Sequence, residues 1–230
     1  MKTLGDGAVE GTATHANLPN WRQYDEQPDL PPVLLTALDL FVEHGYHATT
    51  VRNIASRANL SVPGLYHHYP TKQAMLVSLL EYGMEDMTRR IEVALAEADD
   101  DPGERLSALV YATVLFMTYR WKIGFLMVSE LRGLEPESRE WYQSVNAAQE
   151  DLVIETVRVG SDSGDFLTRH PRDAGRAVLR MCQGIAGWFR PETHGPPEVI
   201  AYRYVRFALR LARARSEWPP PEGPDSLTPE

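Results

Sequence analysis

Residues 37–72 read ALDLFVEHGYHATTVRNIASRANLSVPGLYHHYPTK, and this stretch decides the fold. Its apolar spacing and helix breakers predict short helices over residues 32–44, 51–58 and 62–69. Leu65 and Tyr69 stand four residues apart and are expected to join one core. Only Asn59 and Leu60 separate the second helix from the Ser61 cap of the third, which is typical of a helix-turn-helix. We expect Asn59 to take the left-handed conformation that ends the second helix.

The outer surface of the third helix is predicted to meet DNA. Because Leu65 and Tyr69 turn inward, other side chains must point out, namely Val62, Pro63, Tyr66 and His67. Gly64 keeps the start of this helix thin. Such a surface can approach base edges in the major groove, which is wide enough for one helix.

Hydroxyl groups and cations flank that surface. The Thr50 and Ser61 hydroxyls, together with the backbone N–H groups at the helix start, suit phosphate oxygens. Arg52 and Lys72 supply the positive charge that DNA binding needs, and we expect both to be surface positions. Arg57 lies opposite the core face and is expected to be solvated.

Residues 37–72 resemble the N-terminal domain of the TetR family of transcriptional repressors. The shared features are Phe41, Gly45-Tyr46, Thr49-Thr50-Val51, Ile54-Ala55, Ala58, Ser61, Leu65-Tyr66, His68-Tyr69 and Lys72. The resemblance implies DNA-backbone contacts by Thr50, Tyr66, His68 and Lys72. It likewise implies that Arg52, Val62, Pro63, Gly64 and His67 lie against or near bases. For His68, a packed imidazole with one satisfied nitrogen is an equal alternative.

The segment departs from the family in its charge. Val62 occupies a place where the family often has Lys or Arg, and Leu30-Pro31-Pro32 lacks the usual basic residue. Between Pro31 and Leu80 the cations are Arg52, Arg57 and Lys72, and the acids are Asp39 and Glu43. We therefore expect modest, salt-sensitive DNA affinity, with part of the site read through thymine methyl groups.

The bulk composition limits the class of protein. The chain has 230 residues, of which 43% are hydrophobic, so it can bury a sizeable core. Its net charge of -9 excludes a general nucleic-acid coat protein. Its single cysteine, Cys182, excludes an internal disulfide framework and suits a reducing cytoplasm. No apolar export segment begins the chain, and the uncharged stretch 106–119 is too short to cross a bilayer, so we expect a cytoplasmic protein with no membrane partner.

The remaining chain predicts an all-α fold of about nine helices. After the helix-turn-helix, helices are expected over residues 71–98, 102–120, 123–131, 136–159, 172–189 and 197–215, with clear breaks at 160–165 and 191–197. The predicted organisation is a disordered arm (1–30), a DNA-binding domain (31–77), a helical effector-binding and dimerisation domain (78–216) and a disordered proline-rich tail (217–230).

The sequence gives no support for a catalytic or metal site. His67 and His68 are adjacent and point to different helix faces, and no other ligand stands at a metal-binding spacing. Hydrolase, phosphate-loop and zinc signatures are absent, so we expect neither an enzyme nor a bound cofactor.

The second domain is rich in large, adaptable side chains, most of which are expected to fill a helical core. The resemblance implies a cavity between its middle helices for a small-molecule effector. We expect the effector to contact Met87, Tyr111, Leu115, Tyr119, Phe125, Trp141 and Met181. The stretch 184–191 resembles relatives that govern lipid or steroid breakdown and answer to acyl-coenzyme A esters.

The last two helices are predicted to form a homodimer interface. Small residues that would allow close helix approach are Ala174, Gly175, Ala177, Ala186 and Gly187. The arginines of 203–215 alternate with apolar residues and are interpreted as the polar face of an amphipathic helix. A two-fold dimer predicts a palindromic double-stranded operator. Two alternatives stay open: an effector-independent DNA-binding protein, and a small-molecule binding protein with a vestigial helix-turn-helix.

Overall fold

The computed structural model describes residues 20–25 and 27–215, and this part of the chain folds into α-helices joined by short segments. The helices are α1 (Pro32–His44), α2 (Val51–Arg57), α3 (Val62–His68), α4 (Lys72–Glu97), α5 (Pro102–Tyr119), α6 (Trp121–Ser129), α7 (Pro136–Ser163), α8 (Pro171–Gln183), α9 (Ile185–Trp188) and α10 (Pro197–Ala212). A 3-10 turn, η2 (Leu131–Gly133), joins α6 to α7. The expected all-α class is confirmed, and the short α9 is the element beyond the expected nine in the described residues.

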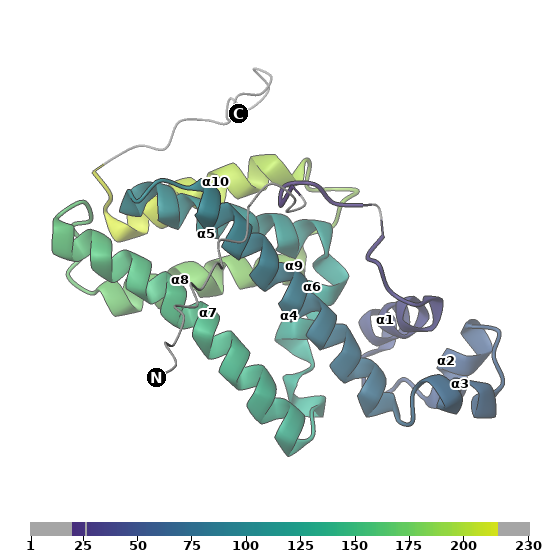
Figure 1. The fold of residues 1–230 in the computed structure, drawn as a ribbon. Helices are drawn as coiled ribbons and strands as arrows, with labels where there is room; N and C mark the ends of the chain where they lie inside the picture. The colour runs from purple at the N-terminus through teal and green to yellow at the C-terminus, as the bar shows by residue number, and fades with distance from the viewer. Residues whose placement is uncertain (1–19, 26, 216–230) are drawn as a thin grey trace, which may run out of the picture.

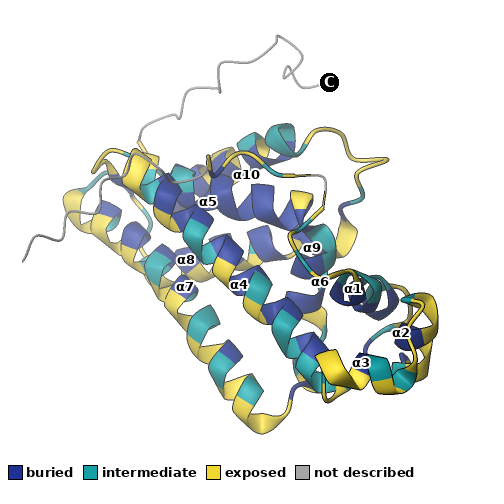
Figure 2. Cartoon of the chain, turned by 45° about the vertical axis from the view of Figure 1, so that its right-hand side comes forward, coloured by how far each residue is buried: buried dark blue, intermediate teal, exposed yellow. Residues whose placement is uncertain are grey.

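The helices form two units joined by α4 (Figure 1). Helices α1–α3 pack together at one end, and α4 runs from them into the larger bundle of α5–α10. Helix α5 lies in the middle of that bundle, between α4, α7, α8 and α10, and is buried along most of its length (Figure 2). No helix in the described part of the chain is long and apolar enough to cross a membrane.

Helix α7 is longer than the sequence pattern predicts. The sequence predicts a loop from residue 160, but the helix continues through Gly160 to Ser163. A Cβ atom at Gly160 would lie 2.4 Å from Cδ2 of Phe166, so this glycine makes room for an aromatic ring that folds back onto the helix. The helix ends at Gly164, whose φ of 84° is left-handed.

The expected single helix over 172–189 is divided in two. Helix α8 ends at Gln183, Gly184 caps it with a backbone N–H bond to the carbonyl of Arg180, and the single turn of α9 follows. Glycine has low helix propensity, which favours a break at this position.

The predicted disorder of residues 1–30 is wrong for residues 20–25 and 27–30, which we call the strap. Trp21 is 2% exposed, and its Nε1 donates a 2.7 Å hydrogen bond to the Glu97 carboxylate. Arg90 donates to the backbone carbonyls of Trp21 and Gln23 at 2.8 and 2.9 Å. Aromatic burial and these long-range bonds order a segment without helical periodicity. The rest of the predicted arm and tail, 1–19 and 216–230, lies outside the described residues.

Candidate DNA-binding surface and effector cavity

The turn between α2 and α3 has the geometry expected of a helix-turn-helix. Asn59 has a φ of 55°, so its predicted left-handed conformation is confirmed. The Leu60 N–H donates to the Ala55 carbonyl at 2.9 Å, and the Asn59 N–H donates to Ser56 at 3.3 Å. These two bonds form a Schellman motif, which fixes the direction in which the chain leaves α2.

Thr50 and Ser61 are the N-caps of α2 and α3. Thr50 Oγ1 accepts from the Asn53 N–H, and the Asn53 side chain accepts from both the N–H and the hydroxyl of Thr50. Ser61 Oγ accepts from the Gly64 N–H at 3.1 Å, and in the described structure its own hydroxyl hydrogen is not donated. The Ser61 hydroxyl is therefore available to a phosphate oxygen, whereas the Thr50 hydroxyl is held within its cap.

Helix α3 presents an exposed outer face. Leu65 is fully buried, Tyr66 is 46% exposed, and Pro63, His67 and His68 are exposed as well. Figure 2 shows this end of the molecule with much of its outward surface in the exposed class. Val62, expected to point out, is only half-buried because it also packs against the core.

Lys72 differs from its expected surface position. Its Nζ donates 2.7 Å hydrogen bonds to the carbonyl oxygens of Tyr46 and Thr49 and lies 4.2 Å from the centre of the Tyr46 ring. Burial lowers the pKa of this ammonium group. Lys72 therefore ties the start of α4 to the loop between α1 and α2, and only one of its three N–H groups remains for DNA.

The two arginines of α2 have different surroundings. Arg52 is exposed and forms no ion pair with the described residues. Arg57 donates two hydrogen bonds to Glu43 of α1, at 2.5 and 2.9 Å. This bond lowers the pKa of the Glu43 carboxyl. Arg57 thus joins α1 to α2, and Arg52 is the more available cation.

A junction connects the DNA-binding unit to the larger bundle through residues that sequence reasoning did not select for this role. The ring of Tyr46 packs against Gly133 of η2, where a Cβ atom would lie 2.8 Å from Tyr46 Cδ1. With its amide turned to the orientation that satisfies every neighbour, Gln73 donates to the Gly133 carbonyl and the Tyr46 hydroxyl and accepts from the Glu135 N–H, each at 3.0 Å. Their sequence spacing carries no signal of this junction, because its contacts join residues that are far apart along the chain.

The residues predicted to contact the effector are distributed over α4–α8. Met87, Tyr111 and Leu115 are buried. Phe125, Trp141 and Met181 are half-buried and pack against the same core. A cavity of about 650 Å³ lies instead between α1, the α5–α6 junction and the segment that links α9 to α10, and Tyr119 is the member of the predicted set that lines it. The set itself stays a prediction.

The small residues of α8 and α9 have two roles. Ala174, Gly175 and Ala186 are buried within the chain, so the prediction that they meet a partner is wrong for them. A Cβ atom at Gly175 would lie 2.8 Å from the backbone of Ile154, which shows that this glycine lets α7 and α8 approach closely. Ala177 and Gly187 are exposed and remain candidates for the interface.

No group of three or more His, Cys, Asp or Glu residues in the described structure could hold a metal ion. His67 and His68 thus stand without further ligands in this part of the chain.

Family models match both units of the structure. The model for bacterial regulatory proteins of the tetR family matches residues 33–79, and the model for the tetracyclin repressor-like C-terminal domain matches residues 99–212. The chain belongs to the TetR family. Its fold and its relatives are those of transcriptional regulators and not of enzymes.

Individual transcriptional regulators are also similar to this chain. The HTH-type transcriptional repressor KstR2 of Rhodococcus jostii (strain RHA1) is 26% identical over 75% of this TetR-family chain and 85% of its own. The transcriptional activator FasR of Mycolicibacterium smegmatis (strain ATCC 700084 / mc(2)155) is 32% identical over 57% of this chain and 59% of its own. A crystal structure of AibR with isovaleryl coenzyme A and operator DNA has 27% identity and a TM-score of 0.69, and covers 76% of this chain and 95% of that one.

Proposed function

We propose that this TetR-family protein is a cytoplasmic, homodimeric repressor that binds a palindromic operator and is released by a small hydrophobic or amphipathic effector. The outer face of α3 carries this proposal, because Pro63, Tyr66 and His67 are exposed beside the buried Leu65. A helix held by one buried residue with its opposite face free can enter the major groove. The proposed DNA contacts are Thr50, Arg52, Ser61, Val62, Pro63, Gly64, Tyr66, His67, His68 and Lys72.

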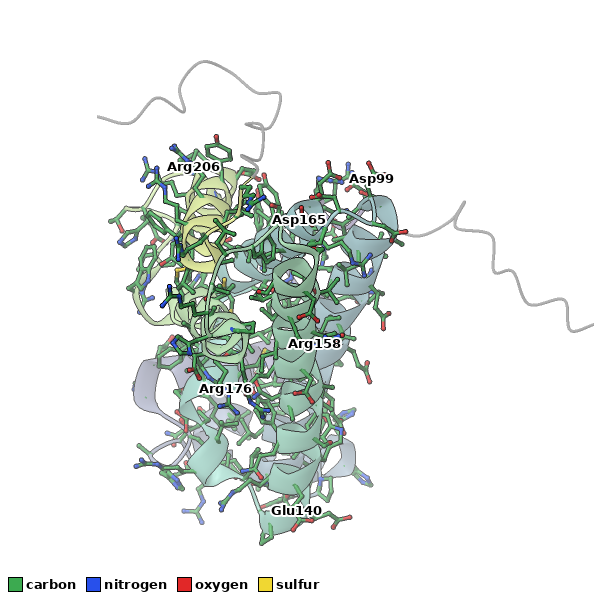
Figure 3. The ribbon with its side chains drawn as sticks, turned by 90° about the vertical axis from the view of Figure 1, so that its left-hand side faces the viewer. Asp99, Glu140, Arg158, Asp165, Arg176 and Arg206 are labelled. Atoms are coloured by element: carbon green, nitrogen blue, oxygen red, sulfur yellow. The ribbon has the colours of Figure 1, made fainter. Side chains whose placement is uncertain are left out.

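The proposed dimer interface lies on α8–α10. Apolar side chains are exposed there at Trp188, Phe207 and Leu211, which are 42%, 47% and 37% exposed. In Figure 3, α8 and α10 lie on the same side of α7, with Arg176 and Arg206 labelled on them. Exposed apolar residues with a rim of polar side chains are typical of a protein–protein interface.

The effector class is supported by the relatives. AibR has been captured with isovaleryl coenzyme A and operator DNA, and another relative at 26% identity is KstR2. We propose an acyl-coenzyme A ester or a similar amphipathic molecule for this chain. Its binding would move α4, change the separation of the two α3 helices and weaken operator binding, and operator would weaken effector binding by the same factor.

The proposal is tested by selecting genomic fragments with the purified dimer at low salt and sequencing them. We expect one enriched palindrome, and we expect isovaleryl coenzyme A to release it in a fluorescence anisotropy assay. Enrichment without release by any acyl ester would support an effector-independent DNA-binding protein. Ligand binding with no salt-dependent DNA binding would support a ligand-binding protein whose helix-turn-helix is vestigial. If the protein increased transcription from a reporter that carries the operator, it would be an activator and not a repressor.

A further inference from the structure

The cavity of about 650 Å³ is formed by both units of the molecule. Helix α1 contributes Leu35, Leu38 and Asp39, and the larger bundle contributes residues 118–123 and parts of the segment between α9 and α10. Its volume lies within the range of about 300–1,000 Å³ that is usual for small-molecule sites. A ligand in this cavity would touch the DNA-binding unit directly.

In the described part of the chain, a buried cation with no ion-pair partner lines the cavity. Arg120 is 5% exposed and forms no ion pair with the described residues. Its Nη1 donates to the Asp25 carbonyl of the strap at 2.8 Å and its guanidinium lies 5.2 Å from the centre of the Tyr24 ring, but its Nε has no hydrogen-bond partner among the described residues. A buried charge with an unsatisfied donor is costly, so this position favours an acceptor that carries negative charge.

The other charged groups of the cavity do not neutralise Arg120. Lys122 of α6 pairs with Asp39 of α1 at 2.5 Å, which leaves no net charge from these two residues. Glu192 also lines the cavity, but it is exposed to solvent. In water its interaction with a buried cation is weakened by the high dielectric constant.

Apolar and aromatic side chains form much of the remaining lining. Trp121 and Phe189 lie beside Leu35 and Leu38, and Tyr119 completes the aromatic group. Phe189 is 1% exposed, so its ring is held in place. An apolar wall with one convergent cation is suited to an amphipathic anion.

We propose that this cavity is a binding site for an amphipathic oxyanion, with the carboxylate or phosphate held by Arg120 and the apolar body packed among Leu35, Trp121 and Phe189. The strap forms part of the wall through Gln27 and Pro28, and its Asp25 carbonyl occupies one donor of Arg120. The anion binds as the strap shifts and gives the buried Nε an acceptor.

A ligand in this cavity would act directly on the DNA-binding unit, and the effect on operator binding rests on the proposed function. The Lys122–Asp39 pair crosses the cavity between α6 and α1. An oxyanion near Lys122 competes with Asp39 for the same ammonium group and loosens α1 from the bundle. This effect does not depend on movement of α4.

The test is calorimetric titration of the full-length dimer in the absence of DNA. The probes are sodium decanoate and isovaleryl coenzyme A, which separate a carboxylate from a phosphate source, with 1-decanol as the neutral counterpart. Leu35→Trp fills the cavity from α1, and Arg120→Gln removes the cation. The matched controls are Thr36→Trp at the next position of α1 and Arg158→Gln on the exposed face of α7.

We expect at least one anion to bind the wild type and 1-decanol to bind about tenfold more weakly, which corresponds to the loss of one charged contact. Leu35→Trp and Arg120→Gln should each lower the affinity for that anion by about tenfold or more. Both controls should keep the wild-type affinity. If Arg120→Gln does not fold, the anion affinity of Leu35→Trp tests the proposal by itself. Binding of neither anion to the wild type, or equal binding to Leu35→Trp, overturns the proposal. Anion binding without release of operator would leave the site standing and remove its regulatory role.

Discussion

The ammonium nitrogen of Lys72, the first residue of α4, lies 2.7 Å from the carbonyl oxygen of Thr49, the residue before the N-cap of α2. A second bond of the same length reaches the Tyr46 carbonyl. The long helix that enters the regulatory bundle is therefore bonded to the loop that begins the helix-turn-helix. Any movement of α4 must act on this loop.

Lys72→Met should lower the free energy of unfolding by about 1–3 kcal/mol, because it removes a charged donor from two backbone carbonyls. Arg52→Met is the matched control and should stay within about 0.5 kcal/mol, as expected of an exposed residue. Both values come from urea denaturation of the dimer at a fixed protein concentration. Equal stability of the two variants would show that the Lys72 bonds contribute little.

Arg52→Gln should reduce the magnitude of the slope of log affinity against log salt by about 1, because one positive charge beside the DNA is lost. Arg57→Gln should leave that slope unchanged, since Arg57 is paired with Glu43. Anisotropy titrations on the selected operator between low and moderate salt measure both slopes. The reverse ranking would place Arg57 and not Arg52 beside the DNA.

Gly175→Ala should destabilise the protein by about 1–3 kcal/mol, because the added methyl group overlaps the backbone of α7. The overlap is direct, since the new Cβ atom lies 2.8 Å from Ile154 Cα. Gly184→Ala, whose Cβ position has no neighbour closer than 3.4 Å, is the control and should be neutral or slightly stabilising. Thermal unfolding measures the difference in stability between the two variants. Equal melting temperatures would show that α7 and α8 move apart at little cost.

Glu150 should make stability depend on pH in the acidic range. Its hydrogen bond from Arg176, helped by the charge of Arg180, holds the pKa of the Glu150 carboxyl below its usual value of 4.5. A carboxyl whose pKa is lower in the folded state stabilises it above the unfolded pKa, and this contribution is lost as the pH falls through the folded value. Melting temperatures of wild type and Glu150→Gln should therefore differ at about pH 7 and converge as the pH falls through the lowered pKa of Glu150. A difference in melting temperature that stays constant across this pH range would show that the Glu150 charge is not its cause.

Trp21→Ala should destabilise the protein by about 3 kcal/mol, a value usual for loss of a buried aromatic side chain. The indole is 2% exposed and bonded to Glu97 across the bundle. Gln23→Ala is the control, because the Gln23 side chain is exposed and its backbone carbonyl, which Arg90 uses, is retained. Denaturation curves that coincide for the two variants would mean that the strap does not contribute to global stability.

The helix-turn-helix could be predicted because its signals are local. Thr50 and Ser61 cap helices whose N–H groups lie three residues away, and Asn59 ends α2 through its own backbone conformation. The same holds for α1, whose predicted bounds are those observed. Such interactions act within one helical turn, so the order of residues along the chain is sufficient to specify them.

The strap, the Lys72 bonds and the cavity were decided by the tertiary structure. Trp21 meets Glu97 across 76 residues, and Lys122 meets Asp39 across 83. The prolines on either side of Trp21, Pro19 and Pro28, indicate only that no helix forms there, and they do not indicate that a bundle face will bury its ring. The sequence determined which helices form and which face of α3 is free. The packing of those helices determined where Arg120 is buried without an ion-pair partner among the described residues, because burial and unsatisfied donors arise only when distant segments exclude water together.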